Sequence, residues 1–493
     1  MSNNHSIEIT QRFFELLLSN YPHDPTEEQK CALELLSKYL CLKDKNSIFL
    51  LRGYAGTGKT SAIAALVKTL SEYNWSVSLL APTGRAAKVM TNYSGLQAST
   101  IHRKLYFKTS RGGSNYFALM QNLHKNTVFI VDEASMISIQ RGVKNPFERE
   151  RSLLEDLIHY VKEGVGCQLI LVGDTAQLPP VLEDESFALQ REFITDSFGL
   201  TVFEYELKEV VRQAKSSGIL YNSFQIRNQQ NLNIDNKTES LKYPKLYSSE
   251  FDDVVRINGR ELQDELENMN GRFGIQGCMV VTRSNKRANN FNQQIRSRIL
   301  WHEDEICTGD LLMVVKNNYF WLGADSEAGF IANGDSIEIL NIRGYEELYG
   351  KRFANVICRM IDYPNQPDLE LKILLDTLMI DGPNLPAKEM KQFFEAVEED
   401  YMEFSNRKQR IKKVLENPYF NALQVKFAYA VTCHKAQGGQ WPAVFIDQGY
   451  LTDTMMNNEY LRWLYTAITR AQEIVYLVNF IDKFFPEEQS ETF

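Results

Sequence analysis

The chain lacks the features that mark membrane, secreted and zinc-ribbon proteins. It contains no apolar run of about 18 residues, which excludes a membrane-spanning helix. The first residues have neither the basic start nor the apolar core of a secretory signal. The cysteines form no Cys-x-x-Cys pair, so we expect neither a zinc ribbon nor a redox motif. We expect scattered, reduced thiols in a cytoplasmic protein, at positions 31, 41, 167, 278, 307, 358 and 433.

Basic residues are also in the minority. The 54 lysines and arginines against 63 aspartates and glutamates give a net charge of −9, which excludes a protein that is basic over its whole surface. A nucleic-acid binder with a local basic groove is still allowed, because only the field at the groove acts on the ligand. The apolar share of 44% is ordinary for a folded protein. The length suggests about three domains.

Apolar runs of strand length alternate with longer helical stretches from Ser47 onward. Continuously apolar strands separated by helices are typical of a parallel sheet that is covered on both faces. Residues 1–45 have helical spacing and precede the first strand. The sequence therefore predicts two α/β domains, whose ligands would bind at the carboxyl ends of the strands. The expected strands are 47–53, 77–83, 126–133 and 167–174 in the first domain, and 277–285, 423–435, 441–447 and 473–480 in the second.

A different pattern separates the two halves of the second group of strands. Residues 305–375 contain short alternating segments, which predict a small antiparallel barrel. Residues 385–415 are highly charged, and their apolar positions follow the spacing of an amphipathic helix. These positions are Met390, Phe393, Phe394, Val397, Tyr401 and Phe404. The second α/β domain is thus expected to carry an insertion of strands and a helix.

One glycine-rich segment carries specific chemistry. Residues 53–60, GYAGTGKT, fit the pattern G-x-x-x-x-G-K-[ST] after an expected strand and before an expected helix. The glycines allow backbone N–H groups to wrap phosphates, and the helix N-terminus adds positive potential. Lys59 would reach the β- and γ-phosphates, and the Thr60 hydroxyl would hold Mg²⁺. A simple glycine-rich turn is the alternative, and the position between strand and helix argues against it.

Acidic and polar residues end two further strands. Asp132 would join the Mg²⁺ shell, and Glu133 would orient and deprotonate the attacking water. Gln177, after the next strand, would sense the γ-phosphate, although an acidic turn before two prolines is an equally good interpretation. Arg212 and Arg470 are candidates to neutralise charge on the transferring phosphoryl group. A lone arginine is more often a surface charge, and spacing does not separate the two interpretations.

The order of these motifs resembles the superfamily 1 helicases, specifically the 5′→3′ branch with RecD-like, Dda-like and Pif members. The segments that carry the resemblance are PTEEQ (25–29), GYAGTGKT (53–60), APTGRAA (81–87), STIH (99–102), VDEAS (131–135), GDTAQLPP (173–180), VVRQ (210–213), AVTCHKAQGGQ (430–440) and LYTAITRA (464–471). It implies an α/β protein with two RecA-like P-loop domains and ATP in the cleft between them. Lys59, Glu133 and Gln177 would act from the first domain, and Arg212 and Arg470 from the second domain or the hinge side.

The resemblance also implies which residues contact the ligands. The expected nucleotide contacts are Gln29, which would read the adenine edge, and Gly53, Gly56, Thr57, Gly58, Lys59, Thr60, Gly438 and Gln440. The expected contacts with single-stranded DNA are Pro82, Thr83, Thr100, His102, Thr432 and His434. Hydroxyl, imidazole and backbone N–H groups suit sequence-independent contacts with phosphates. Without the resemblance, the two histidines would be interpreted as core residues.

A hairpin is expected at residues 103–124. Two aromatic segments flank Arg111-Gly112-Gly113, which is typical of a tight hairpin turn. The resemblance implies that this hairpin is a pin that splits the duplex at a fork, with aromatic rings stacking on bases. A surface hairpin whose rings pack inward is an equal alternative for any one ring. The rings are Tyr106, Phe107, Tyr116 and Phe117, of which Phe107 is assigned to DNA.

The insertion at residues 305–420 resembles the SH3-like barrel of the same branch. Its helical stretch would be a hook that braces the pin, or else a solvated charged face. The expected domains are 1–200, then 201–304 together with 421–493, and the insertion 305–420. The short stretch before residue 25 and the segment after Glu133 favour a Dda-like or short RecD-like protein over a Pif protein, and the subfamily stays open.

We therefore expect an ATP- and Mg²⁺-dependent DNA helicase that moves on single-stranded DNA as a monomer. The 5′→3′ direction rests on the resemblance alone. The expected partners are single-stranded DNA and DNA forks, with replication or repair proteins, and the expected processes are DNA replication, repair and recombination. A DNA-stimulated P-loop ATPase that serves as a regulatory or assembly subunit is the alternative. The threonine and histidine positions and the hairpin favour the motor.

Overall fold

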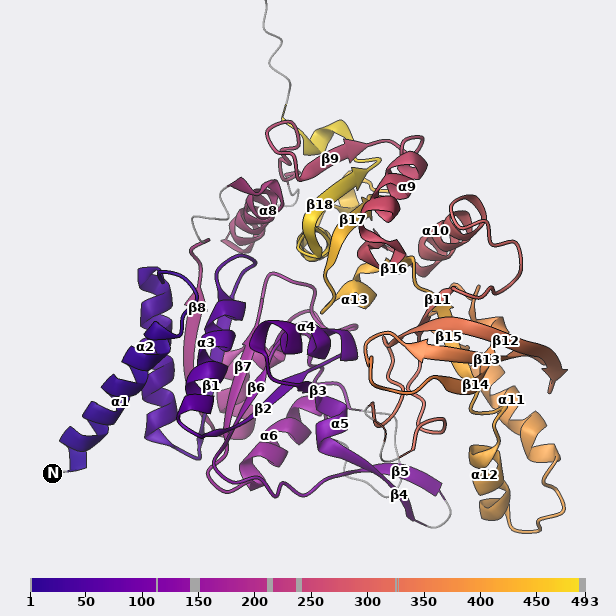
Figure 1. Ribbon diagram of the computed structural model, residues 1–493, viewed down its shortest axis with the longest axis horizontal. Helices are drawn as coiled ribbons and strands as arrows, with labels where there is room; N and C mark the ends of the chain where they lie inside the picture. The colour runs from indigo at the N-terminus through magenta and orange to yellow at the C-terminus, as the bar shows by residue number, and fades with distance from the viewer. Residues whose placement is uncertain are drawn as a thin grey trace, which may run out of the picture.

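Two parallel sheets, a closed barrel and a two-stranded hairpin make up the β-structure of the computed structural model (Figure 1). The structure describes residues 2–111, 114–141, 151–210, 216–235, 242–323, 326 and 328–486. No helix within these ranges is long and apolar enough to cross a membrane. The two parallel sheets and the inserted barrel confirm the fold class expected from the sequence.

The first sheet has the strand order β3-β2-β6-β7-β1-β8, and every neighbouring pair in it is parallel. Its strands are β1 (Ser47–Gly53), β2 (Ser76–Ala81), β3 (Ala98–Thr100), β6 (Thr127–Val131), β7 (Gln168–Gly173) and β8 (Thr201–Leu207). The four strands expected in this domain are confirmed. The sequence did not show the two edge strands, because β3 has three residues and most side chains of β8 are not fully buried.

Helices cover both faces of this sheet. They are α1 (Ser2–Ser19), α2 (Glu27–Leu42), α3 (Lys59–Glu72), α4 (Gly84–Ser94), α5 (Ile101–Leu105), α6 (Leu153–Glu163) and α7 (Arg191–Phe198). Alternate residues of β1 point to opposite faces: Phe49 packs with Leu36 and Leu66 of α2 and α3, whereas Leu50 packs with Leu157 of α6. Burial on both faces explains why the strands read as continuous apolar runs.

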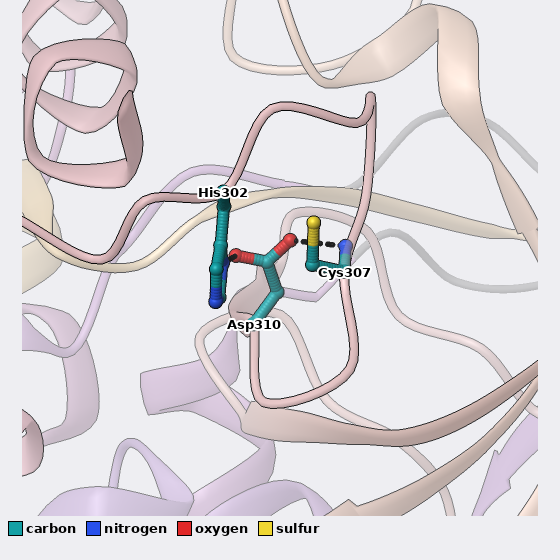
Figure 2. Close-up of side chains that lie close together, drawn as sticks. All are labelled: His302, Cys307 and Asp310. Carbon is teal, nitrogen blue, oxygen red and sulfur yellow. Dashed lines mark hydrogen bonds and ion pairs between the residues drawn. The ribbon is translucent and has the colours of Figure 1, made fainter. Parts of the chain in front are cut away.

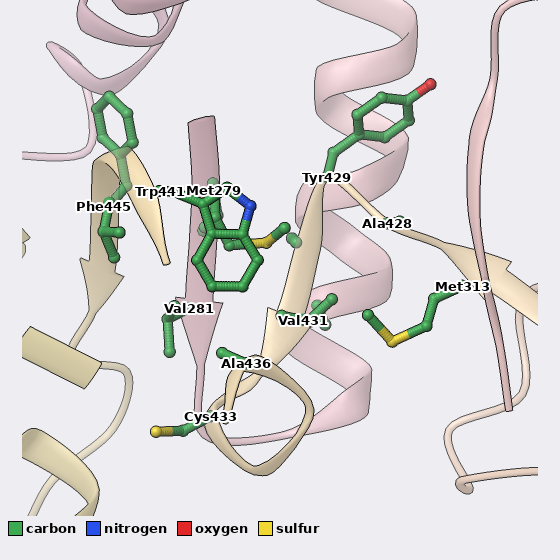
Figure 3. Close-up of a cluster of buried hydrophobic side chains, with 14 of the residues drawn as sticks. Met279, Val281, Met313, Ala428, Tyr429, Val431, Cys433, Ala436, Trp441 and Phe445 are labelled. Carbon is green, nitrogen blue, oxygen red and sulfur yellow. The ribbon is translucent and has the colours of Figure 1, made fainter. Parts of the chain in front are cut away.

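The second sheet has the order β16-β10-β17-β18-β9 and is also parallel throughout. Its strands are β9 (Val254–Ile257), β10 (Cys278–Thr282), β16 (Ala430–Thr432), β17 (Trp441–Asp447) and β18 (Ala471–Val478). The associated helices are α8 (Gly218–Asp235), α9 (Leu262–Phe273), α10 (Asn285–Arg298), α13 (Cys433–Ala436) and α14 (Asn458–Ile468). Met279, Val281, Val431, Trp441 and Phe445 belong to the core of this domain (Figure 3).

The barrel closes from β11 (Leu311–Val314), β12 (Ser336–Leu348), β13 (Lys351–Met360), β14 (Leu369–Leu374) and β15 (Leu423–Phe427). The expectation of one strand over 423–435 was wrong. The first part, β15, pairs with β11 and with β14, and only β16 enters the second sheet. Both parts are apolar and buried, so the sequence gave no sign of the boundary. The β14–β15 pair is parallel, which corrects the expectation of a wholly antiparallel barrel. The domain limits themselves stay predictions.

The helical extension of the barrel lies against the hairpin. It consists of α11 (Ala387–Glu399) and α12 (Arg407–Glu416), and the hairpin of β4 (Tyr106–Arg111) and β5 (Ser114–Leu119). The helix expected to continue to Phe404 ends at Glu399 instead. Phe393 and Val397 are buried in one cluster with Phe353 of β13. The Cα atoms of α12 approach those of β5 within 8 Å, so the charged stretch is more than a solvated face (Figure 1).

Candidate active site

The glycine-rich segment forms a tight loop between β1 and α3. Gly56 and Gly58 have φ angles of +73° and +94°, a region that favours glycine. A Cβ atom on Gly58 would lie 2.4 Å from the side-chain nitrogen of Gln29, so a larger residue would not fit. The Lys59 ammonium donates hydrogen bonds to the carbonyl oxygens of Gly53 and Tyr54, at 2.7 and 2.8 Å. The loop therefore curls around the lysine and has the form of a phosphate cradle.

Gln29 and Thr57 brace this loop from behind. The Gln29 Nε2 atom donates to the Thr57 carbonyl at 2.9 Å, and its Oε1 accepts from the Thr26 N–H at 2.9 Å as part of a capping box. The buried Thr57 hydroxyl donates to the Tyr54 carbonyl at 2.8 Å. The Gln29 amide is thus engaged by the backbone. Its expected contact with adenine stays a prediction.

Asp132 and Glu133 follow β6 directly. The two Asp132 carboxylate oxygens accept hydrogen bonds from the Tyr93 hydroxyl at 2.6 Å and the Glu133 N–H at 2.8 Å. Burial and the neighbouring Glu133 raise the pKa of Asp132 to about 6, while the Lys59 charge opposes the rise. Glu133 has a φ of +52°, which is strained for a residue with a side chain and is often found at functional sites. The sequence gave no signal for Tyr93.

The second domain supplies an arginine that lies close to Glu133. Arg470, between α14 and β18, is 3% exposed, and its Nη1 lies 3.8 Å from Oε1 of Glu133. Its guanidinium also donates to the carbonyl oxygens of Thr466 at 3.0 Å and Gly439 at 3.3 Å. The predicted pair of Glu133 and Arg470 is therefore brought together across the two domains. Arg212, the other predicted arginine, lies outside the described residues.

The loop after β7 is held by the second domain. The Leu178 N–H donates to the Thr466 hydroxyl at 2.8 Å, and Gln437 Nε2 donates to the Leu178 carbonyl at 2.7 Å. Gln177 is buried, and its side-chain oxygen has no hydrogen-bond partner among the described residues. A buried acceptor without a partner is rare in proteins. Sequence reasoning missed Gln437 and Thr466, although both lie inside the motifs quoted above.

Gly438 and Gln440 have a different environment from the one expected. Gly438 has a φ of +73°, and a Cβ atom there would lie 2.9 Å from the Cβ of Ala86 and 3.2 Å from Oγ1 of Thr83. The exposed Gln440 accepts a hydrogen bond from Gln472 at 3.1 Å. Gly438 thus lies against segment 81–87, and Gln440 lies at the surface. The assignment of both residues to the nucleotide stays a prediction without a contact to support it.

Three predicted DNA contacts share one local geometry. Thr83, Thr100 and Thr432 are the N-cap residues of α4, α5 and α13, which follow β2, β3 and β16. The Thr83 hydroxyl accepts from the Ala86 N–H and the Thr100 hydroxyl from the Arg103 N–H, both at 3.2 Å. The Thr432 hydroxyl makes no such capping bond. Backbone N–H groups at these strand ends suit phosphate contacts, and Pro82 leads into the first of them.

Histidines and lysines line the same region. Burial lowers the pKa values of His102 and His434, so both imidazoles are neutral at pH 7. Neutral imidazoles agree equally well with contacts to DNA and with core histidines. Burial and the nearby Lys426 lower the pKa of Lys435 to about 8. Desolvated ammonium groups are costly unless a counter-charge approaches, and an anionic ligand would supply one.

The barrel closes this region from a third side. The Lys88 ammonium donates to the Ile361 carbonyl at 3.0 Å, and Arg103 donates to the Ser326 carbonyl at 3.4 Å. The Lys435 ammonium donates to the side-chain oxygen of Asn333. The predicted DNA contacts of both domains therefore meet where the two sheets and the barrel adjoin. The sequence predicts that DNA lies here, and we use the name groove for this predicted site, formed by segments 81–88, 100–103 and 432–435.

The hairpin aromatics behave differently from one another. The Tyr106 hydroxyl donates to Asp156 of α6 at 2.7 Å, which is the inward-packed alternative. Phe107 is 46% exposed, which suits a ring that contacts DNA. The side chains of Tyr116 and Phe117 lie outside the described residues.

A group of possible metal ligands lies at the start of the barrel (Figure 2). One ligand atom each of His302, Cys307 and Asp310 lies within 4.8 Å of the others. However, the Arg296 guanidinium donates two hydrogen bonds of 2.9 Å to the buried Asp310 carboxylate, which also accepts from the Tyr429 hydroxyl. A fixed cation at this carboxylate opposes a metal ion. We interpret the group as a junction that fixes α10 to the barrel.

Comparisons with known proteins agree with this geometry. Residues 26–240 match the AAA domain family, and residues 427–478 match the UvrD-like helicase C-terminal domain family. Protein R530 of Acanthamoeba polyphaga mimivirus is 24% identical and covers 91% of this chain and 98% of its own. The ATP-dependent DNA helicase dda of Enterobacteria phage T4 is 31% identical over 193 residues, 38% of this chain and 40% of that protein. The ATP-dependent RecD2 DNA helicase of Deinococcus radiodurans is 31% identical over 156 residues.

The chain thus spans less than half the length of the relatives that are named as helicases, 40% of dda and 18% of RecD2. Among solved structures, Pif1 helicase from Bacteroides in complex with ADP-AlF3 and ssDNA covers 92% of this chain, at 15% identity and a TM-score of 0.45.

The two sheets and the phosphate loop define the architecture of a two-domain P-loop protein. In its motif order and in both family matches, the chain is similar to the group of helicases with RecD-like, Dda-like and Pif members.

Proposed function

We propose that this protein is an ATP-dependent DNA helicase that moves along single-stranded DNA in the 5′→3′ direction. One observation carries the proposal: Arg470 of the second domain lies 3.8 Å from Glu133 of the first, beside a phosphate loop. Because this site combines groups of both domains, the rate of ATP hydrolysis depends on how the two domains are positioned relative to each other. A motor needs this dependence, and a simple phosphoryl-transfer enzyme with one domain does not.

The nucleotide site uses groups from both domains. Lys59 and the loop N–H groups hold the phosphates, Glu133 orients and deprotonates the attacking water, and Arg470 neutralises the charge that develops. Gln177, whose buried side-chain oxygen has no hydrogen-bond partner among the described residues, reports on the terminal phosphate through its amide N–H group.

Mg²⁺ fits the donors that are present. The Thr60 hydroxyl at the start of α3 and the Asp132 carboxylate at the end of β6 are hard oxygen ligands of the kind that Mg²⁺ prefers. An ion held there would neutralise phosphate charge at the loop.

Single-stranded DNA lies in the groove. Thr83, Thr100 and Thr432 contact its phosphates through hydroxyl and backbone N–H groups, and the lysines supply positive charge in a chain of net charge −9. The hairpin with the exposed Phe107 acts as the pin at a fork, and α12 braces it. The substrates are thus single strands and forked duplexes. The protein works in the cytoplasm, in DNA replication, repair or recombination.

Tailed duplexes test the proposal. The full chain is incubated with ATP and Mg²⁺ and with duplexes that carry a 5′ tail, a 3′ tail or no tail. Unwinding of the 5′-tailed duplex, together with ATP hydrolysis stimulated by oligodeoxythymidylate, is the expected result. Stimulated hydrolysis without unwinding of any duplex would favour a regulatory ATPase. Unwinding of the 3′-tailed duplex alone would show movement in the 3′→5′ direction and contradict the proposed direction.

A further inference from the structure

Tyr465 connects two loops of the first domain from the opposite side of the cleft. It lies on α14 and is 1% exposed. Its hydroxyl accepts a hydrogen bond from the Ala55 N–H at 2.8 Å and donates one to Oδ2 of Asp174 at 2.7 Å. Ala55 lies inside the phosphate loop, and Asp174 follows β7 directly. One oxygen atom of the second domain thus touches both nucleotide-site loops.

The surroundings make this contact difficult to replace. Asp174 is buried, and burial raises its pKa, while the charge of Lys59 opposes the rise. The other Asp174 oxygen accepts from the Ala176 N–H at 2.9 Å, so the tyrosine supplies one of two hydrogen bonds. Thr466, the next residue of α14, accepts from the Leu178 N–H at 2.8 Å. A movement of α14 therefore moves the loop after β7 with it.

The same helix is joined to the groove. The Cys433 thiol on α13 donates to the Trp463 carbonyl of α14 at 3.5 Å. Its neighbours Thr432 and His434 are the predicted DNA contacts of the second domain. A continuous path of contacts therefore runs from the groove through α13 and α14 to the Tyr465 hydroxyl and the phosphate loop.

We propose that Tyr465 is the positioning residue through which DNA in the groove changes the rate of ATP hydrolysis. The proposal rests on the helicase function proposed above, and it names the contact that couples DNA binding to ATP hydrolysis. Tyr465 does not touch the reacting atoms. Its hydroxyl holds the phosphate loop and the Asp174 loop in one arrangement, and DNA adjusts that arrangement by moving α13 and α14. A path of contacts is not itself proof of coupling, so the test measures coupling directly.

The variant Tyr465→Phe removes the hydroxyl and keeps the ring. Steady-state kcat is measured on the full chain with and without oligodeoxythymidylate, alongside the midpoint of thermal unfolding. We expect the ratio of the two kcat values to fall about tenfold, the change that follows loss of one hydrogen bond to a charged group. DNA affinity without nucleotide, measured by fluorescence anisotropy, should stay within about twofold, because the groove residues are intact.

Tyr429 offers a matched control elsewhere in the fold. Its buried hydroxyl accepts from the Leu311 N–H at 3.0 Å and donates to Asp310 at 2.9 Å, the same arrangement of N–H, hydroxyl and carboxylate. It sits where the barrel joins the second sheet, with the hydroxyl directed away from Trp441 (Figure 3). Tyr429→Phe should lower thermal stability as Tyr465→Phe does, and leave the kcat ratio at the wild-type value.

Each outcome decides the matter. A tenfold lower ratio in Tyr465→Phe alone supports the proposal. An unchanged ratio, including an equal fall of both kcat values, overturns it and leaves a structural role. If Tyr465→Phe does not fold, Asp174→Asn carries the test, since an amide has one oxygen and cannot accept from both the Ala176 N–H and the Tyr465 hydroxyl. A lower ratio is again expected. A wild-type chain without any DNA stimulation would instead overturn the proposed function.

Discussion

Arg470 and Glu133 lie 3.8 Å apart, Nη1 to Oε1, although they adjoin strands of different parallel sheets, β18 and β6. Arg470 is anchored by two backbone carbonyls, and Glu133 is held in a left-handed backbone conformation. Both groups are thus fixed before any ligand arrives. Fixed charges of this kind stabilise a transition state without reorganising during the reaction.

The first prediction follows from this pair. Arg470→Ala should lower the kcat of ATP hydrolysis by about 10³-fold or more, the range for an arginine that neutralises a transferring phosphoryl group. Arg470→Lys should restore little, because an ammonium cannot reproduce the forked donors of a guanidinium. Steady-state kinetics measures both variants, and thermal unfolding checks that they fold. An Arg470→Ala protein that keeps more than about a tenth of its wild-type kcat would contradict the assignment.

The second prediction concerns the phosphate loop. Lys59 donates to two loop carbonyls and would exchange these bonds for phosphate oxygens. Lys59→Ala should therefore abolish ATP turnover while single-stranded DNA still binds, since the groove residues lie on other loops. Anisotropy with a labelled oligonucleotide, together with an ATPase assay, measures both properties. Substantial turnover in this variant would refute the site.

Motif residues that act alone could be predicted from the sequence, whereas contacts between domains could not. The phosphate loop is local, so its pattern of glycines predicted the fold of residues 53–60. Tyr465 lies within a recognised motif, yet its partners Ala55 and Asp174 are about 290 to 410 positions away in the chain, and no spacing rule reaches that far.

The boundary inside 423–435 was missed for a related reason. β15 belongs to the barrel and β16 to the second sheet, but both are buried apolar strands. Burial patterns show that a strand is covered, and they do not show which sheet covers it. The same limit applies to Gly438, which the motif assigned to the nucleotide and whose nearest neighbours are Ala86 and Thr83.

The third prediction separates movement along DNA from strand separation. Phe107 is 46% exposed, so Phe107→Ala should leave thermal stability and DNA-stimulated ATP hydrolysis close to wild type. Duplex unwinding should slow about tenfold or more, because a base–aromatic stack contributes about 1–3 kcal/mol. Tyr106→Phe is the matched control: it loses the bond to Asp156 and should affect stability more than unwinding. A parallel loss of all three properties, or undiminished unwinding, would remove the pin assignment.

The fourth prediction concerns salt. The chain is acidic overall, yet Lys88, Arg103 and Lys435 lie in the segments that line the groove and contact the barrel there. The logarithm of the DNA binding constant should fall linearly with the logarithm of salt concentration, because bound DNA releases counterions. Lys435→Gln should reduce the slope by about 0.7, the value for one phosphate of a single strand. Lys391→Gln, on the exposed face of α11, should leave the slope unchanged. A flat response of the wild type would argue against a groove that follows the backbone.

The last prediction concerns a buried ammonium in the barrel. Lys426 on β15 is buried, donates a hydrogen bond to the Ile380 carbonyl and forms no ion pair with a carboxylate in the described part of the chain. Burial lowers its pKa from 10.5 to about 8, while the charge of Asp381 opposes the fall. Below pH 8 the folded protein therefore holds a desolvated charge, which costs stability.

Between pH 8 and 10.5 the folded state has released this proton and the unfolded state still binds it. The unfolded state then holds more protons, so stability rises with pH and the cost of the charge disappears. Lys426→Met should accordingly be more stable than wild type at pH 7, and the difference in unfolding midpoint should shrink by pH 10. Lys372, whose ammonium pairs with Glu346 at 2.9 Å, supplies the control. Lys372→Met should destabilise the barrel at pH 7, since it removes a partner of a carboxylate. An equal difference between Lys426→Met and wild type at both pH values would show that Lys426 is not desolvated in the folded protein.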